Sequence, residues 1–326
     1  MDGKRQFGII RLCIMAAVVF LTLCFTVTAG GWLMVDIALT PHNTESHDKA
    51  GSLSYMRTTY PQIAPWLDSL QACHGLRDTT IINAEGVRLK GYFVRASHPT
   101  KYTAVLVHGY TDNAIRMLHI GYLYHHDLHY NIIVPDLQFH GGSEGRAIQM
   151  GWNDRRDVLR WIGVTEQLFP DAQIVVHGIS MGAATTLCVS GEPDLPHSVR
   201  AFVEDCGYTS VWDEFGIQIK EKYGMPRFPV LYAASAVCKL RFGWSFGEAS
   251  PLEQVKKAKQ PICFIHGDGD SYVPTWMVYQ LYAACKTRKR LWIAPNVKEH
   301  AKSYGVHPTE YKKLVRCFLT TEAGMK

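Results

Sequence analysis

The chain has 326 residues, of which 47% are hydrophobic and 19% charged, so it carries enough apolar material for one large core plus an appendage. Its formal net charge at pH 7 is only +5. The one basic cluster (Lys286, Arg288, Lys289, Arg290) lies beside a strand-like run and lacks interleaved aromatic residues. We interpret this cluster as a solvated helix end, and we expect no nucleic-acid partner.

The N-terminus has the pattern of a membrane-spanning helix. Basic residues up to Arg11 precede an uncharged run from Leu12 to Val35, which is long enough to span about 30 Å of hydrocarbon. The positive-inside rule then predicts a single-pass protein of the cell membrane with the rest of the chain on the extracytoplasmic side. The alternative is a signal peptide cleaved after the small residue Ala29, which would give a secreted protein. The length of the run favours a retained anchor, because the apolar part of a signal peptide usually stops at about 15 residues.

Two further segments follow the anchor. The stretch 40–52 is rich in Pro, His, Asn, Thr and Ser, which is typical of a linker. The stretch from Tyr55 to Arg77 predicts an amphipathic helical brace, with Trp66, Leu67 and Leu70 packing on the domain. We therefore divide the chain into a stub and anchor (or signal peptide) at 1–39, a linker and brace at 40–78, and a main domain at 79–326.

The main domain alternates between strand-like and helix-like runs. Two β-rich runs, 79–84 and 87–96, flank a Glu85-Gly86 turn and predict an antiparallel hairpin. Continuous apolar runs, which are typical of strands covered on both faces, follow at 104–107, 132–134, 174–176, 201–203, 262–265 and 291–293. Helix-like stretches between them fall at 153–168, 183–188, 275–285 and 308–319. The pattern predicts an α/β fold with an eight-stranded, mostly parallel sheet and helices on both faces.

One connection is longer than a crossover requires. The interval at about 207–251 carries nine aromatic residues and follows the sixth predicted strand. We expect a small helical insertion there, either acting as a lid over a site at the strand ends or packing its aromatic residues against one another.

Metal binding is not indicated by the histidine and cysteine patterns. His125 and His129 are spaced i, i+4, but no glutamate base follows them, and they precede a strand away from the expected site. Seven cysteines lie outside the anchor without a disulfide or zinc spacing, so most are expected to be buried small hydrophobic residues. We expect no metal and no cofactor.

The strongest chemical signal is the sequence Gly178-Ile179-Ser180-Met181-Gly182, which lies between a predicted strand and a helix-forming run. A serine hydroxyl becomes a nucleophile only when it is exposed, faces a base and is backed by donors for the oxyanion. A tight strand-to-helix turn meets these needs, and its glycines permit the close backbone approach. Ser180 is therefore the candidate nucleophile.

From about Thr79 to its C-terminus the chain resembles the α/β-hydrolase superfamily. Within it, the chain is most similar to bacterial anchored hydrolases related to serine aminopeptidases and monoglyceride lipases. Besides the serine motif, the resemblance rests on four segments that each follow a predicted strand: 106–112, 135–145, 203–208 and 266–270.

The resemblance implies a role for each site residue. The oxyanion would be held by the backbone amides of Met181 and Tyr110. The spacing His-Gly-x-x-Asp implies Asp270 as the triad acid, with Asp268 as the fallback. The base would come from the loop before the last helix, where His300 fits. His307 is its rival, but it immediately precedes Pro308 and so marks the start of that helix.

The function expected is hydrolysis of an ester, carboxylesterase-like or lipase-like, through an acyl-enzyme on a Ser-His-Asp triad. The partners would be a small or lipid-like acyl substrate and, through the N-terminal helix, a membrane. The alternatives are an aminopeptidase-like amide hydrolase, an acyltransferase, or an inactive scaffold that binds a lipid or envelope partner through the same pocket.

Overall fold

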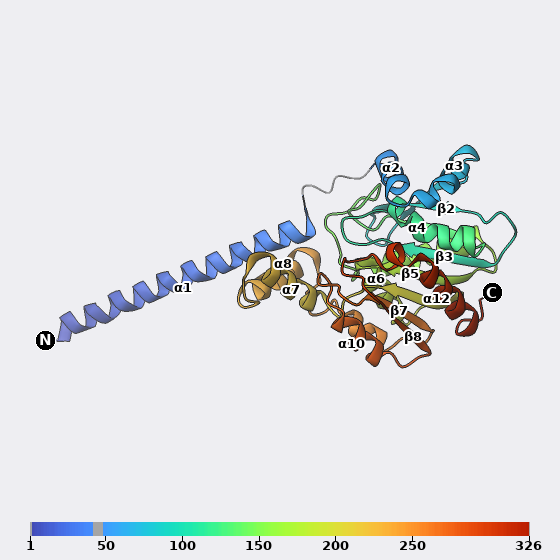
Figure 1. Ribbon diagram of the computed structural model, residues 1–326. Helices are drawn as coiled ribbons and strands as arrows, with labels where there is room; N and C mark the ends of the chain where they lie inside the picture. Colours follow the sequence, from blue (N-terminus) through green and yellow to red (C-terminus); the bar gives the residue numbers. More distant parts are fainter. Residues whose placement is uncertain (1, 42–47, 326) are drawn as a thin grey trace.

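The computed structural model describes residues 2–41 and 48–325, and of residues 2–5 only the backbone. Its centre is an eight-stranded sheet with the order β1-β2-β4-β3-β5-β6-β7-β8 (Figure 1). The β1–β2 and β2–β4 pairs are antiparallel and every other pair is parallel, so the sheet is mostly parallel and begins with an antiparallel hairpin, as predicted. The strands are β1 Arg77–Ile82, β2 Arg88–Val94, β3 Tyr102–Val107, β4 Asn131–Pro135, β5 Gln173–Ile179, β6 Val199–Asp205, β7 Ile262–Gly267 and β8 Lys289–Ala294.

The sheet lies between two hydrophobic cores, which explains the continuous apolar runs of its central strands. Along β3, Val105 and Val107 point into one core, whereas Ala104 and Leu106 point into the other. The first core is covered by α5 (Asp154–Leu168), α6 (Met181–Ser190) and α10 (Trp276–Ala284). The second is covered by η2 (Ala114–Met117), α4 (Leu118–Tyr122), η3 (Leu123–Asp127) and α12 (Pro308–Thr321). Two short helices, α9 (Pro251–Val255) and α11 (Ser303–Val306), complete the domain.

The brace at 55–77 is helical over most of its length, as predicted, but it is divided into several helices. It consists of α2 (Lys49–Thr59), the short η1 (Pro61–Ile63) and α3 (Ala64–Ala72), after which the chain enters β1. Pro61 has no backbone N–H and disfavours helical geometry in Tyr60, so the helix ends there. The predicted linker 40–52 is also too long: residues 42–47 lie outside the described residues, and α2 already begins at Lys49, capped by Asp48. Trp66, Leu67 and Leu70 are buried, as predicted.

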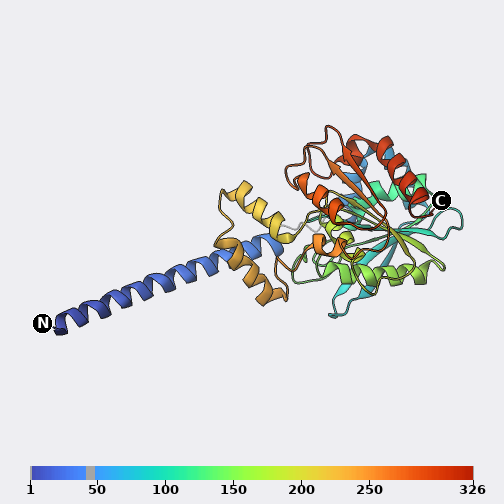
Figure 2. The same ribbon diagram turned by 90° about the horizontal axis from the view of Figure 1, so that it is seen from below.

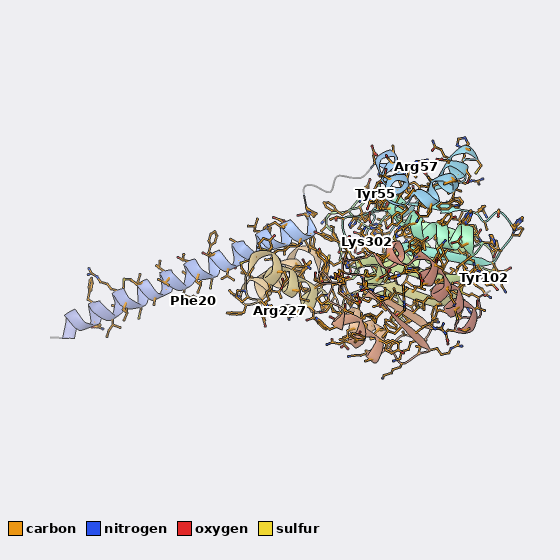
Figure 3. The ribbon with its side chains drawn as sticks, viewed as in Figure 1. Phe20, Tyr55, Arg57, Tyr102, Arg227 and Lys302 are labelled. Atoms are coloured by element: carbon orange, nitrogen blue, oxygen red, sulfur yellow. The ribbon has the colours of Figure 1, made fainter. Side chains whose placement is uncertain are left out.

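The N-terminal helix α1 (Asp2–Leu39) projects far from the rest of the molecule (Figure 2). Within its stretch Gln6–Leu39 an 18-residue window has a mean hydropathy of 2.5, so the helix is long and apolar enough to cross a membrane, although a signal sequence would meet the same criteria. Phe20 lies on the projecting part, away from every other element (Figure 3). The last turns behave differently, because Val35 and Leu39 are fully buried in the first core.

The insertion after β6 is helical, as predicted. It forms α7 (Val211–Tyr223) and α8 (Val230–Phe242), and each helix ends at a glycine with positive φ, Gly224 and Gly243. Both views place α7 and α8 beside the domain end of α1, and α8 packs directly on it (Figures 1 and 2). These two helices and the end of α1, residues 31–39, are called the roof below.

Candidate active site

The turn between β5 and α6 holds Ser180 in a strained backbone conformation, with φ 57° and ψ −119°. The chain can pass so tightly only because of the flanking glycines. A Cβ on Gly178 would lie 2.0 Å from the carbonyl oxygen of Gly182, and a Cβ on Gly182 would lie 2.0 Å from that of Val107. The turn places the hydroxyl of Ser180 at the carboxyl edge of the sheet and at the N-terminus of α6, where the helix dipole favours negative charge.

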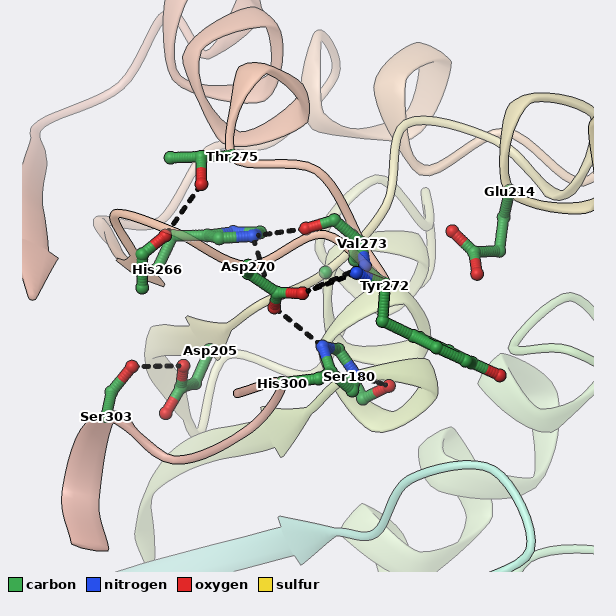
Figure 4. Close-up of polar contacts among 12 residues, drawn as sticks. Ser180, Asp205, Glu214, His266, Asp270, Tyr272, Val273, Thr275, His300 and Ser303 are labelled. Carbon is green, nitrogen blue, oxygen red and sulfur yellow. Dashed lines mark hydrogen bonds and ion pairs between the residues drawn. The ribbon is translucent and has the colours of Figure 1, made fainter. Parts of the chain in front are cut away.

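The structure brings together the three side chains that the sequence nominates. His300 Nε2 lies 2.7 Å from Ser180 Oγ, and His300 Nδ1 lies 2.7 Å from Asp270 Oδ2 (Figure 4). Asp270 is buried, whereas Ser180 and His300 are only partly covered. The carboxylate is therefore shielded from water, and the serine stays accessible to a substrate.

Backbone donors fix the carboxylate of Asp270. Its Oδ1 accepts hydrogen bonds from the amides of Tyr272 (3.0 Å) and Val273 (3.1 Å), which leaves Oδ2 for His300. His266, at the end of β7, hydrogen bonds through Nε2 to the carbonyl of Val273 at 2.8 Å and so braces the same turn.

The two rival residues have other partners. Asp268 accepts from the amides of Asn296 (2.8 Å) and Val297 (2.9 Å), so it ties the β7 loop to the loop that carries His300. His307 hydrogen bonds through Nε2 to the carbonyl of Pro295 at 2.7 Å and stands at the start of α12. Asp268 thus supports the site without contacting His300.

Two amides are available for an oxyanion. Within the described part of the chain, the backbone amides of Tyr110 and Met181 donate to no other group. The loop that carries Tyr110 passes close to the serine, because a Cβ on Gly109 would lie 3.9 Å from Ser180 Oγ. The next amide in that loop, Thr111, donates to His140 Nε2 at 3.1 Å. Burial lowers the pKa of His140 to about 4, so its imidazole is neutral and can accept this bond.

Behind the triad lies a buried polar chain that the sequence analysis did not assign. Asp205, at the end of β6, accepts from Ser303 Oγ (3.4 Å) and from the hydroxyl of Tyr311 (3.1 Å), which also contacts His177 Nε2 at 2.9 Å. Burial raises the pKa of Asp205 to about 7. The segment 203–208 was noted for its family pattern, but nothing in it indicated that Asp205 would lie behind His300.

Cys206 was also missed. Its Sγ and the ligand atoms of Asp270 and His300 lie within 4.8 Å of one another. Burial raises the pKa of the Cys206 thiol well above its usual range, so the sulfur stays protonated and neutral beside the triad. Asp270 Oδ2 and His300 Nδ1, the atoms that would ligate a metal there, contact each other instead.

The histidine pair that the sequence analysis considered for a metal does not share a site. His125 Nδ1 accepts from the indole of Trp66 at 3.0 Å, and its Nε2 lies 3.0 Å from the carbonyl of Arg95. His129 lies beyond η3 with a positive φ of 59°, so the helical i, i+4 geometry is absent there.

A pocket extends from Ser180 under the roof. It is lined mainly by apolar and aromatic side chains from α1, α7, α8 and the loops around the serine: Met34, Ile37, Ala38, Tyr110, Met150, Met181, Tyr208, Phe215, Ile219, Tyr223, Leu231, Ala234, Phe246, Tyr272 and Val273. Glu214, Gln218 and Lys222 are the polar side chains that α7 contributes to the lining.

Glu214 is the unusual member of this lining. Its side chain is 3% exposed, and its Oε1 accepts from Gln218 Nε2 at 2.9 Å. Its Oε2 has no hydrogen-bond partner among the described residues. Burial raises the pKa of Glu214 to about 8, so the pocket holds a carboxyl group that is mostly protonated at neutral pH.

Comparisons of the sequence with known proteins agree with this architecture. A family model described as the alpha/beta hydrolase fold matches residues 103–225. The uncharacterized protein YqkD of Bacillus subtilis is 32% identical over 240 residues, which cover 73% of this chain and 77% of YqkD. The alpha/beta hydrolase domain-containing protein WAV2 of Arabidopsis thaliana is 24% identical over 218 residues, 65% of this chain and 67% of WAV2.

Solved structures share the fold. Esterase Pf2001 of Pyrococcus furiosus matches with a TM-score of 0.62 and 21% sequence identity, covering 78% of this chain and 94% of the esterase. An acylaminoacyl peptidase of Pyrococcus horikoshii matches with a TM-score of 0.57 and 20% identity, covering 77% of this chain and 42% of the peptidase. At these identities the structures are evidence for the fold alone. The family model, the similarity to YqkD and the shared fold show that this chain belongs to the α/β-hydrolase superfamily.

Proposed function

We propose that this protein hydrolyses carboxylic esters with an apolar acyl group through an acyl-enzyme on Ser180. The observation that carries the proposal is the pair of 2.7 Å contacts that link Ser180 Oγ, His300 and Asp270. Such a relay positions a base against the serine and a carboxylate against the base, which is the arrangement that serine hydrolases use.

Each group has a defined task in this mechanism. His300 Nε2 takes the proton of Ser180 as Oγ attacks the ester carbonyl, while the amides of Tyr110 and Met181 hold the oxyanion. His300 then gives that proton to the departing alcohol. Water, deprotonated by the same nitrogen, attacks the acyl-enzyme and releases the acid. Asp270 holds the imidazole in the required tautomer and stabilises its charged form.

The lining of the pocket supports an apolar acyl group. Apart from the polar side chains of α7, the space beside Ser180 is walled by aliphatic and aromatic groups. Burying a methylene there contributes about 0.8 kcal/mol, so a chain of several carbons gains substantial binding energy.

A second candidate function rests on Glu214. Its Oε2 has no partner among the described residues, and the positive charge of an aminoacyl substrate's amino group would lower the pKa of Glu214 and pair with the ionised carboxylate. This feature favours an aminopeptidase-like amide hydrolase over an esterase. Acyl transfer to an acceptor other than water uses the same acyl-enzyme, and only product analysis with candidate acceptors separates it from hydrolysis.

We further propose that α1 anchors the protein in the cell membrane with the catalytic domain on the extracytoplasmic side. Support comes from the length and hydropathy of Gln6–Leu39 and from the basic residues before it. Cleavage after Ala29 is the alternative, and N-terminal sequencing of the mature protein from a membrane fraction distinguishes the two. A mature chain that begins at Gly30 would refute the anchor.

Labelling with a fluorophosphonate probe tests the catalytic proposal. The full-length chain should become labelled, and Ser180→Ala should abolish both labelling and ester turnover while the melting temperature stays unchanged. Labelling that persists in the variant would refute the assignment of the nucleophile. A wild-type protein that neither reacts with the probe nor turns over any ester would favour the inactive scaffold.

A matched panel of p-nitrophenyl esters and aminoacyl p-nitroanilides then separates the two candidate substrates. We expect turnover of the esters. Activity confined to the anilides would favour the amide hydrolase and overturn the ester proposal.

A further inference from the structure

The domain end of α1 is part of the pocket that contains Ser180. Met34, Ile37 and Ala38 line that pocket, although they are about 140 residues away from the serine in sequence. On the same stretch, Val35 and Leu39 are fully buried in the core of the domain. The helix that projects from the molecule therefore also supplies a wall of the candidate substrate site.

Close packing holds this wall in place. A Cβ on Gly31 would lie 2.7 Å from the backbone of Ala233, so α1 and α8 approach at small residues. Arg241 of α8 forms an ion pair with Asp36 of α1 at 2.6 Å, and its guanidinium lies 4.6 Å from the ring centre of Trp32.

The same wall is hydrogen bonded to the loop 108–112 after β3, which carries Tyr110 and is called the oxyanion loop below. The hydroxyl of Tyr110 donates to the carbonyl of Ala38 at 2.8 Å, and the amide of Ile148 donates to the carbonyl of Leu39 at 2.8 Å. The backbone amide of Tyr110 is one of the two proposed oxyanion donors. A single residue, Tyr110, thus connects the end of α1 with the proposed oxyanion site.

The pocket reaches the surface where α1 would leave the bilayer. Ile37 lines the pocket and is still 46% exposed, and Tyr223 at the end of α7 lines it and is 47% exposed. The charge-free run of α1 ends at Val35, and Asp36 is the first charged residue after it. With a helical rise of 1.5 Å per residue, Ile37 lies about 3 Å beyond the end of that run. In the proposed membrane orientation of α1, the mouth of the pocket would therefore lie near the membrane surface.

The exposed surface of the insertion and of the domain end of α1 has the composition of a membrane interface. Phe228, Tyr232 and Leu240 of the insertion are strongly exposed, as is Trp32 of α1. Basic side chains accompany them on the insertion, among them Arg227 on the connection between α7 and α8 (Figure 3). Aromatic rings and basic groups together are favoured at the level of lipid headgroups.

We propose that the substrate is a bilayer-resident lipid ester whose acyl chain slides from the membrane past Ile37 into the pocket walled by α1. The inference rests on the proposed ester hydrolysis and adds where the substrate comes from and which residues select it. Met34, Ile37 and Ala38 act as acyl-chain-binding residues. The chain moves from one apolar environment to another, so it need not cross water on its way to Ser180.

The experiment uses the full-length protein reconstituted in phosphatidylcholine vesicles. Two esters are compared, p-nitrophenyl dodecanoate, which partitions into the bilayer, and p-nitrophenyl acetate, which stays in water. The readout is the ratio of their kcat/KM values. Met34→Trp fills the pocket and Ile37→Gln makes its mouth polar. The matched control is Leu33→Gln, which changes an exposed residue of the same helix that does not line the pocket.

We expect Met34→Trp and Ile37→Gln each to lower the dodecanoate-to-acetate ratio at least tenfold, and Leu33→Gln to leave it within twofold. In the wild type, adding phosphatidylcholine at constant total dodecanoate should lower the rate in proportion to the mole fraction of ester in the bilayer.

Fluorophosphonate labelling of every variant separates the two proposals. If labelling and acetate turnover persist but all three variants keep the wild-type ratio, the inference about α1 is wrong while the esterase stands. A dodecanoate rate that stays constant when phosphatidylcholine is added would likewise refute delivery of the substrate from the bilayer. If the wild-type protein itself were not labelled, the proposed ester hydrolysis would instead be wrong.

Discussion

The floor of the active site and its roof are built in different ways. The floor consists of Ser180, Asp270 and His300, which follow the strands β5, β7 and β8 and are held by backbone hydrogen bonds of short turns. The roof joins the end of α1 to α7 and α8, about 200 residues later in the chain, mainly through apolar packing. We therefore expect the floor to determine the chemistry and the roof to select the substrate. The predictions below test that division.

The largest effect is expected in the floor. Asp270→Asn would place an amide against His300 Nδ1 and favour the wrong tautomer of the imidazole, so kcat should fall about 10⁴-fold with little change in KM. Steady-state kinetics with p-nitrophenyl acetate measure this loss.

The matched control for that variant is Asp268→Asn. Asp268 bonds to two amides of the His300 loop but not to the imidazole, so this variant should lower stability by about 1–3 kcal/mol and activity by far less. Equal losses of kcat in the two variants would mean that Asp270 acts only by supporting the loop.

The floor could be read largely from the sequence, because its signals are local. The turn at Ser180 needs glycines at fixed positions, and the strand–loop order places Asp270 and His300 at the same edge of the sheet. The structure brings these three side chains together, and their roles remain a proposal. Six strands were likewise predictable, because two-sided burial requires continuous apolar runs, and β1 and β2 were predictable from the turn between two β-rich runs.

The roof could not be read in the same way. The apolar pattern of α1 is the same whether a side chain faces lipid or the pocket, so nothing in the sequence distinguishes Met34 from Leu33. Glu214 is one of several acidic residues on α7, and only its burial separates it from the others. The break at Pro61 was a readable signal, since proline disfavours helix in the residue before it.

The next largest effect is expected from Glu214 in the roof, because ionisation of its buried carboxyl group lowers the stability of the folded protein. The pKa of Glu214 is raised from 4.5 to about 8, so between these values the unfolded chain releases a proton that the folded protein keeps. Stability therefore falls as pH rises through this window and levels off above pH 8. Glu214→Gln removes the cost, and its gain over the wild type should be near zero at pH 4.5 and on the order of 2–4 kcal/mol at pH 8.5.

Thermal or denaturant unfolding at several pH values checks this expectation. Glu221→Gln on the same helix is the control, because Glu221 is exposed and its substitution removes no buried carboxyl group. A constant gain for Glu214→Gln at every pH would show that packing, and not ionisation, explains the difference.

The smallest effect is expected from the ion pair between the two helices of the roof. Asp36 and Arg241 are partly exposed, so Arg241→Gln should cost about 1 kcal/mol or less and lower the melting temperature by a few degrees. Lys239→Gln is the control, because Lys239 pairs with Glu248 within the insertion and does not bond to α1.

If floor and roof are independent, Arg241→Gln should lower dodecanoate turnover two- to threefold, because the wall loosens, and should leave fluorophosphonate labelling at the wild-type rate. A matching drop in labelling would mean that the bond from Tyr110 to Ala38 transmits the position of α1 to the oxyanion loop. In that case α1 would control the chemistry as well as the choice of substrate.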